Sequence, residues 1–388
     1  MKKKISVFFL NTFIILAVTG LLAYYSPQIL GRAAKSDLKI AEVFSPQSTS
    51  VKNNSEKKTQ NESNITANNA DNNNTASQES AEPSADIIKT DSGIYSHITE
   101  TPQDIAELMA EAEKNIKNEK KAGKTSEEDY FGGGTLVSFN GLEIQSKIPS
   151  SFYKLNIESL LKQKAELSIK DISKPTILVY HSHSTESYTL LDVGYYTKSL
   201  DLRSEKKAKN MVRVGDDLCE YLKKMGFSVI HDRTIHDKDY NSAYDSSRKA
   251  VEKYLEKYPS IEITIDVHRD DITYKNKTKV KPTAVINGKK AARLMIIAGA
   301  EYGSIKNYPD WEYNLRFATA VQNKVNEKYS GLMRPILFSQ RKYNMDETRN
   351  SFLLEVGTDA NTLDEACYSA RLFATALGEL LLEEYVEN

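Results

Sequence analysis

Short apolar runs alternate with longer amphipathic stretches from about residue 136 to the end of the chain. The short runs are rich in Val and Ile and lack the spacing of a helix, as is typical of strands buried inside a sheet. A further segment at 284–288 ends in an Asn-Gly pair, which favours a tight hairpin turn, and another apolar run follows at 292–298. We therefore predict this hairpin together with strands at 176–180, 227–230, 261–267, 335–338 and 352–356.

The amphipathic stretches repeat their apolar residues every three or four positions, as one face of a helix does. Thr362 and Glu365 form the sequence signature of a capping box at the start of the last stretch. We predict helices at 207–225, 246–257, 313–329 and 362–384. Strands that alternate with helices in this way indicate an α/β fold whose sheet is mostly parallel.

The N-terminus has the pattern of a membrane segment. Lys2, Lys3 and Lys4 precede an uncharged run over 5–25, which as a helix would cross the roughly 30 Å hydrocarbon core. The lysines favour a cytoplasmic N-terminus, which places the rest of the chain outside. A cleaved signal peptide is the alternative, but the run is long and lacks an A-x-A site. We expect an uncleaved anchor within 1–30.

The next part of the chain is predicted to be a linker over 31–133. Residues 45–84 are rich in Asn, Ser, Thr and Gln and have few apolar side chains to offset the entropy of ordering, so we expect a disordered tether. Helical spacing returns at 101–121. The glycine triplet at 132–134 lacks the pattern of a phosphate-binding loop and is interpreted as a hinge. The folded domain is predicted to be 134–388.

Composition adds little to this picture. Net charge is -1, from 52 Lys and Arg against 53 Asp and Glu, which does not favour nucleic-acid binding. Neither Cys219 nor Cys367 lies in a C-x-x-C pair, and both fall in predicted helices, so we expect small core residues. A disulfide between them is left open.

Candidate chemistry gathers where the predicted strands end. The segment YHSHSTESY at 180–188 places His181, His183 and Glu186 after the first strand, and His268 follows the strand at 261–267. Glu355 lies inside the apolar strand at 352–356, where a carboxylate is costly unless it is paired. Ligands bind at this edge of open α/β sheets, and His with carboxylate suits a catalytic zinc site. A polar surface loop and an ordinary ion pair are the alternative interpretations.

The other three histidines are interpreted as solvent-exposed: His97, His231 and His236.

Four segments together resemble the stage II sporulation protein P family: YHSHSTESY at 180–188, DVHRD at 266–270, NLRFA at 314–318 and LLEVGTDAN at 353–361. The resemblance runs from about residue 134 to the C-terminus. It implies a membrane-anchored peptidoglycan hydrolase of endospore-forming bacteria, similar to zinc N-acetylmuramoyl-L-alanine amidases. Those amidases have a mostly parallel sheet with helices on both faces, a His-Glu-His zinc site and a catalytic glutamate.

The resemblance also implies roles for individual residues. His268 matches the last zinc-binding histidine, and Glu355 matches the catalytic glutamate. Either His181 or His183 would be the first ligand. Glu186 would be the carboxylate ligand, with Glu205 as the runner-up. Arg269, next to His268, is expected to bind substrate.

The expected reaction is cleavage of the N-acetylmuramoyl-L-alanine amide, together with cross-links between stem peptides. The expected setting is engulfment, in the space between mother cell and forespore, beside the stage II sporulation proteins D and M. A wall-binding or scaffold protein with a vestigial metal site is the alternative from another class. A zinc peptidase acting on protein is disfavoured because no H-E-x-x-H motif is present.

Overall fold

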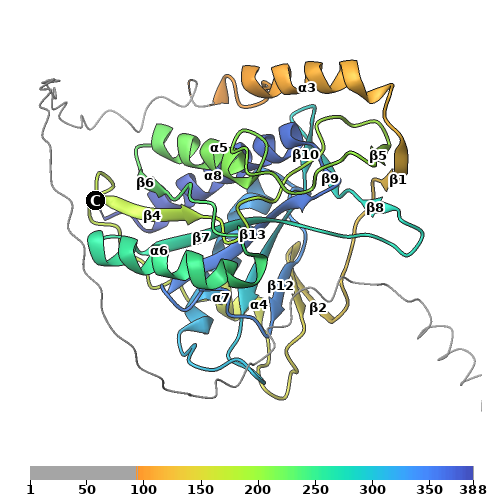
Figure 1. Ribbon diagram of the computed structural model, residues 1–388. Coiled ribbons are helices and arrows are strands. Elements are labelled where there is room, and N and C mark those ends of the chain that lie inside the picture. The colour runs from red at the N-terminus through yellow and green to blue at the C-terminus, as the bar shows by residue number, and fades with distance from the viewer. Residues whose placement is uncertain (1–92, 94, 388) are drawn as a thin grey trace, which may run out of the picture.

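The computed structural model describes residue 93 and residues 95–387 (Figure 1). The predicted anchor within 1–30 and the predicted tether at 45–84 lie outside these residues. Among the helices that are described, none is both long enough and apolar enough to cross a membrane.

An eight-stranded sheet organises the fold, in the order β2-β3-β12-β11-β13-β7-β4-β6. Neighbouring strands run parallel except at β2/β3 and β11/β13, so the prediction of a mostly parallel sheet is confirmed. The strands are β2 (Thr135–Phe139), β3 (Leu142–Ser146), β12 (Ile336–Ser339), β11 (Leu294–Gly299), β13 (Asn350–Thr358), β7 (Ile263–Asp270), β4 (Pro175–Tyr180) and β6 (Ser228–His231).

Helices cover the two faces of this sheet unequally. In Figure 1, β4 and β7 lie between α5 and α8 on one side and α6 on the other. α4, α5, α7 and α8 share one core with the sheet, whereas α6 packs against β4 on the opposite face. The helices are α4 (Ile157–Lys162), α5 (Met211–Lys224), α6 (Ala243–Lys257), α7 (Trp311–Lys328) and α8 (Leu363–Glu384).

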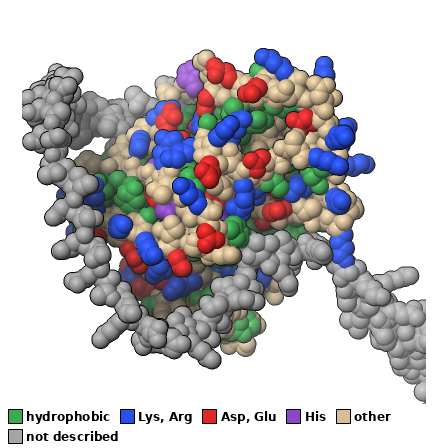
Figure 2. Space-filling model, in the orientation of Figure 1, with side chains coloured by type: hydrophobic (Ala, Val, Ile, Leu, Met, Phe, Trp, Pro, Cys, Tyr) green, Lys and Arg blue, Asp and Glu red, His purple; other side chains and the backbone are tan. Residues whose placement is uncertain are grey.

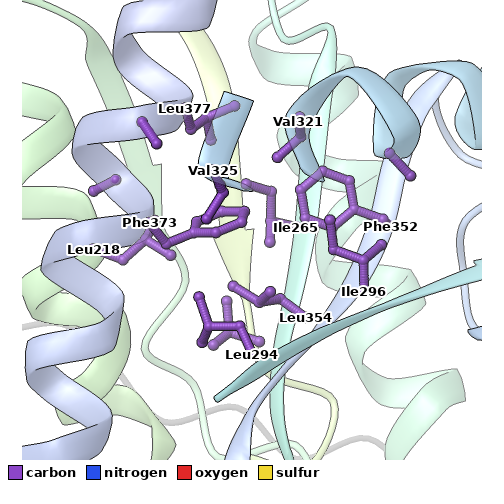
Figure 3. Close-up of a cluster of buried hydrophobic side chains, with 14 of the residues drawn as sticks. Leu218, Ile265, Leu294, Ile296, Val321, Val325, Phe352, Leu354, Phe373 and Leu377 are labelled. Carbon is purple, nitrogen blue, oxygen red and sulfur yellow. The ribbon is translucent and has the colours of Figure 1, made fainter. Parts of the chain in front are cut away.

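Alternation along the central strands decides what each face presents, because successive side chains of a strand point to opposite sides. Phe352 and Leu354 of β13 enter the main core, where Figure 3 shows them beside Ile265, Ile296 and Phe373. Leu353 points the other way and packs with Met295 and Ile297 of β11. This second face is therefore apolar beyond the reach of α6.

Most of the predicted elements are present, and the capping box of Thr362 and Glu365 opens α8 as predicted. The predicted hairpin is partly wrong. β9 (Thr283–Ile286) and β10 (Lys289–Ala292) form a separate two-stranded sheet around Asn287 and Gly288, whose φ angles are 49° and 78°. β11 then joins the main sheet, so the single apolar run at 292–298 belongs to two strands. β7 also continues to Asp270, which places His268 inside the strand.

The folded unit begins before the predicted boundary at residue 134. α3 (Gln103–Ile116) buries Ile105 completely, and Arg213 Nε of α5 donates to Asp104 Oδ2 at 2.6 Å. β1 (Lys121–Ser126) pairs with β5 (Tyr195–Thr197) and with β8 (Lys279–Val280). The part of 31–133 from residue 95 to residue 126 is thus packed on the sheet domain, because its few apolar and charged side chains find long-range partners.

The surface carries no dominant charge on the face shown in Figure 2, where Lys and Arg side chains are interspersed with Asp and Glu. The two cysteines are buried and free, as expected of core residues.

Candidate active site

His268 of β7 and Glu355 of β13 are direct partners in the parallel ladder between these strands. Their side chains point away from the main core, since the neighbours Val267, Leu354 and Val356 fill it. A cavity of about 730 Å³ lies over this face and is lined by both residues and by Glu186. The structure therefore brings together His268, Glu186 and Glu355 of the predicted metal and catalytic residues.

The cavity has an apolar floor and polar walls. Met295, Ile297, Leu337 and Leu353 form the floor. The aromatic and basic side chains of the walls are Tyr130, Lys147, Arg203, Tyr240, Tyr244, Arg334, Arg341 and Tyr343. Such a cavity fits a ligand that has both apolar and charged groups.

His268 is held between two carboxylates. Its Nε2 atom lies 2.8 Å from Asp266 Oδ1, and its Nδ1 atom lies 3.6 Å from Glu186 Oε2. Asp266 also accepts from the backbone N of Ser182 at 2.9 Å and from Ser182 Oγ at 2.6 Å. Burial would lower the pKa of His268, but the Asp266 carboxylate, with Glu186 and Glu355, raises it to about 9. Burial raises the pKa of Glu186, against the opposing effect of His268.

His183 lies beside His268, with ring centroids 5.4 Å apart. Its ring stacks on Tyr240 at 4.4 Å, and its Nδ1 atom is 3.9 Å from Asp237 Oδ2. Burial and then the charge of His268 lower the pKa of His183 to about 3. A neutral imidazole of this kind is the form that binds metals.

His181 occupies a different place, on the α5 side of the sheet. Its Nδ1 atom is 2.9 Å from the carbonyl O of Val267, and its Nε2 atom is 2.9 Å from His231 Nε2. It does not line the cavity. Neither His181 nor His183 lines the cavity, but of the two it is the His183 ring that packs against His268.

Glu355 is a carboxylate in an apolar setting. Among the described residues, its buried Oε2 atom has no hydrogen-bond partner. Burial, followed by the charge of Asp270, raises its pKa well above the usual range, against the opposing charge of His268. A buried carboxyl group of this kind is suited to proton transfer.

Arg269 and Glu205 differ from expectation. Arg269 lines the cavity, but its guanidinium donates to the carbonyls of Ser187 at 2.7 Å and Leu202 at 2.8 Å. Its backbone N donates to Glu186 Oε2 at 3.2 Å. Arg269 thus fixes the loop after β4 and leaves little donor capacity for substrate. Glu205 is exposed and does not line the cavity.

The prediction of exposed histidines holds for His97 alone, whose side chain is 72% exposed. The side chain of His231 is only 6% exposed and lies 3.1 Å from Asp216, and His236 is buried with its Nε2 atom 2.8 Å from Asp232 Oδ2. The prediction of exposure is wrong for these two histidines, because carboxylate partners allow their side chains to lie away from solvent.

Sequence reasoning also missed site residues. Asp266 shares the His268 side of β7 because the two are separated by one residue, so strand alternation could have identified it. Asp237, Tyr240 and Tyr244 come from the connection between β6 and α6 and its first turn. No local pattern distinguishes those three from other loop residues.

The fold and the site together define an α/β protein with a histidine–carboxylate centre on an open sheet face. The chain matches the family described as Stage II sporulation protein P over residues 16–378, and it belongs to that family. It is 29% identical over 256 residues to stage II sporulation protein P of Bacillus subtilis (strain 168), a match that covers 61% of this chain and 60% of that protein.

Two solved structures overlap the chain in part. The N-acetylmuramoyl-L-alanine amidase AmiC2 of Nostoc punctiforme has a TM-score of 0.32 and 10% identity, covering 55% of this chain and 98% of its own. The apo form of the N-acetylmuramyl-L-alanine amidase Ami1 from Mycobacterium abscessus has a TM-score of 0.31 and 11% identity, covering 54% of this chain and 98% of its own.

Proposed function

We propose that this protein is a zinc-dependent peptidoglycan hydrolase that cleaves the amide between N-acetylmuramic acid and L-alanine during sporulation. The observation that carries the proposal is the ladder pair of His268 and Glu355, with Glu186 Oε2 3.6 Å from His268 Nδ1 in the same cavity. Family membership supports the sporulation setting.

Histidine and carboxylate are donor types that zinc prefers, and one pair of donor atoms, from Glu186 and His268, is also suitably spaced. Two tetrahedral ligand atoms, each about 2.1 Å from zinc, lie about 3.4 Å apart. The 3.6 Å between Glu186 Oε2 and His268 Nδ1 is close to that value. Within the described residues, no three His, Cys, Asp or Glu side chains are already arranged to hold a metal ion. Zinc would therefore need a third donor, and we propose His183, whose ring centroid lies 5.4 Å from that of His268.

Zinc at this position would act as a Lewis acid that polarises the amide carbonyl and makes water more acidic. Glu355 would take a proton from water and deliver it to the departing nitrogen, because its carboxyl faces the cavity and its Oε2 atom has no hydrogen-bond partner among the described residues. Asp266 would hold the ring of His268 in one orientation. The apolar floor would exclude bulk water from the reacting amide.

Membrane anchorage and partners are part of the same proposal. The lysines and the uncharged run at 5–25 support an anchor with the enzyme outside the cytoplasm. Mass spectrometry of the membrane fraction should recover peptides from before residue 25, and a mature chain starting near residue 24 would contradict this. Co-purification with the stage II sporulation proteins D and M would test the partners.

The test of the reaction is release of stem peptides from labelled peptidoglycan by the full-length protein, with and without a chelator. We expect activity that the chelator removes and zinc restores. Glu355→Gln should retain zinc but lose turnover by roughly 10²–10⁴-fold, since that is the usual contribution of a general acid–base group. His268→Ala should lose zinc and activity together. Glu205→Gln is the matched control, because it removes an exposed carboxylate outside the cavity.

The outcomes separate the alternatives. Binding to peptidoglycan without hydrolysis in any metal state would favour the wall-binding protein. If Glu355→Gln kept near-parental turnover, Glu355 would not be the proton-transfer residue. Unchanged zinc content in His268→Ala would remove His268 as a ligand. Separating amide products from cross-link products by mass would show whether both cleavages occur.

A further inference from the structure

Two cations line the cavity at the end away from His268. Lys147 directly follows β3, and Arg341 follows β12. These strands are adjacent and parallel, and the backbone N of Lys147 donates to the carbonyl O of Phe338 at 2.8 Å. β3 and β12 run in the same direction as β11, which is antiparallel to β13. The C-terminal ends of β3 and β12 therefore point in the opposite direction from the C-terminal ends of β7 and β13.

The other cations of the cavity wall already have partners. Arg334 Nη1 is 3.0 Å from Asp270 Oδ2, Arg203 Nη1 is 2.9 Å from Asp237 Oδ2, and Arg269 donates to backbone carbonyls. Within the described part of the chain, neither Lys147 nor Arg341 forms an ion pair with a carboxylate. Burial and then the charge of Arg341 lower the pKa of Lys147, as expected when two like charges share a site.

The backbone holds both cations in place. The carbonyl O of Arg341 lies against Gly299 of β11, where an added Cβ would come within 2.2 Å of it. Gly134, the last glycine of the triplet at 132–134, lies beside Lys147, and a Cβ added there would come within 2.7 Å of the carbonyl O of Ser146. A side chain at either glycine would displace the backbone at Arg341 or the backbone directly before Lys147.

A row of aromatic rings connects this cation pair to the histidine–carboxylate centre. The guanidinium of Arg341 lies 5.6 Å from the ring of Tyr343. Tyr343 stacks on Tyr244 at 4.9 Å, and Tyr244 stacks on His268 at 6.2 Å. An extended peptide advances about 3.3 Å per residue, so this row corresponds to roughly three to five residues.

We propose that Lys147 and Arg341 form a subsite for a carboxylate of the peptide that is bound across the apolar floor, a few residues from the scissile amide. This inference rests on the proposed function and deepens it, because it states that the enzyme selects stem peptides with free carboxylates. Lys147 and Arg341 supply the counter-charge for the carboxylate. The rings of Tyr343 and Tyr244 contact the bound peptide between these cations and His268.

The test uses the full-length protein and two substrates: an N-acetylmuramoyl tripeptide with free peptide carboxylates, and the same compound with those carboxylates amidated. Removing both cations in Lys147→Gln/Arg341→Gln should raise KM for the free acid by about tenfold or more and leave kcat nearly unchanged, because charge-assisted hydrogen bonds are lost. On the amidated compound the variant should match the parent. The charge-matched control is Lys249→Gln/Lys253→Gln, two exposed lysines of α6 outside the cavity.

Binding separates this proposal from the reaction itself. Calorimetric titration of Glu355→Gln with the free-acid compound, before and after adding the two substitutions, should show about tenfold weaker binding without the cations. Equal effects on the free and amidated compounds, or no effect on either, would overturn the subsite. A parent protein that binds the free acid through Lys147 and Arg341 but hydrolyses neither compound would overturn the proposed function and leave the subsite standing.

Discussion

At the scale of single residues, hydrogen-bond donors stabilise the buried carboxylates of Asp266 and Asp232. Asp266 is fully buried and its pKa is lowered, because His268 and two donors from Ser182 outweigh the cost of burial. Asp232 follows the same rule away from the cavity. It accepts from Thr234 Oγ1 at 2.6 Å and pairs with His236 Nε2 at 2.8 Å. Burial opposes its ionisation, but His236 and Thr234 lower its pKa to about 2.

This shift predicts a pH-dependent contribution to stability. A carboxylate with a lowered folded pKa stabilises the protein above its ordinary pKa of 3.8 and loses that effect as pH falls through about 2. Asp232→Asn should therefore lower the free energy of unfolding by about 2 kcal/mol at pH 7. The difference from the parent should shrink between pH 4 and pH 2, as measured by urea unfolding. Asp245→Asn, an exposed carboxylate of α6, is the control. A difference that stays constant with pH would contradict the ion-pair explanation.

At the scale of elements, the direction of β11 determines where the cavity lies. β13 runs parallel to β7 but antiparallel to β11, and the short strand β12 then continues parallel to β11. α6 covers the outer face at β4, so Met295, Ile297 and Leu353 remain as the floor of the cavity. α8 packs against β13, and the first turn of α8 is fixed by Thr362 and Glu365.

The capping box predicts a modest and local stability effect. Glu365 N donates to Thr362 Oγ1, and Thr362 N donates to Glu365 Oε2, each at 3.1 Å. Thr362→Ala should lower the free energy of unfolding by about 1 kcal/mol, because one backbone donor at the helix start loses its partner. Thr362→Ser keeps the hydroxyl and should lose less, as measured by chemical denaturation. Equal losses in the two variants would assign the effect to the methyl group instead of the cap.

At the scale of the whole molecule, residues before the predicted boundary complete the core. Arg371 of α8 donates through Nε to the carbonyl O of Ile98 at 2.9 Å and through Nη2 to the carbonyl O of Glu100 at 3.0 Å. Its Nη1 atom is 2.6 Å from Asp217. In Figure 1, α3 lies along the outer side of α5 and α8. A fragment that begins at residue 134 would expose this surface and leave Arg371 with two fewer acceptors.

We therefore expect two fragments to differ in stability. A fragment covering 93–388 should unfold at the same urea concentration as the full-length chain, whereas 134–388 should unfold at a markedly lower one. In the full-length chain, Ile105→Ala should cost about 2–5 kcal/mol, because it removes a fully buried side chain. Glu113→Ala, at an exposed position of α3, is the control. Equal stability of the two fragments would show that the segment 95–126 docks without stabilising the domain.

The sequence by itself determined the α/β class, the long helices and the strands that carry His268 and Glu355, because local periodicity and capping chemistry report the burial of each residue. It also pointed to His268, Glu355 and Glu186, since polar groups stand out in or beside apolar strands. Only the tertiary structure showed that His183 lies beside His268 whereas His181 contacts His231, because these contacts depend on which side of the sheet each ring faces. The register of β7 against β13, the reversed β11, the partners of Arg269 and the docking of α3 all depend on long-range contacts. Local sequence patterns do not determine such long-range contacts.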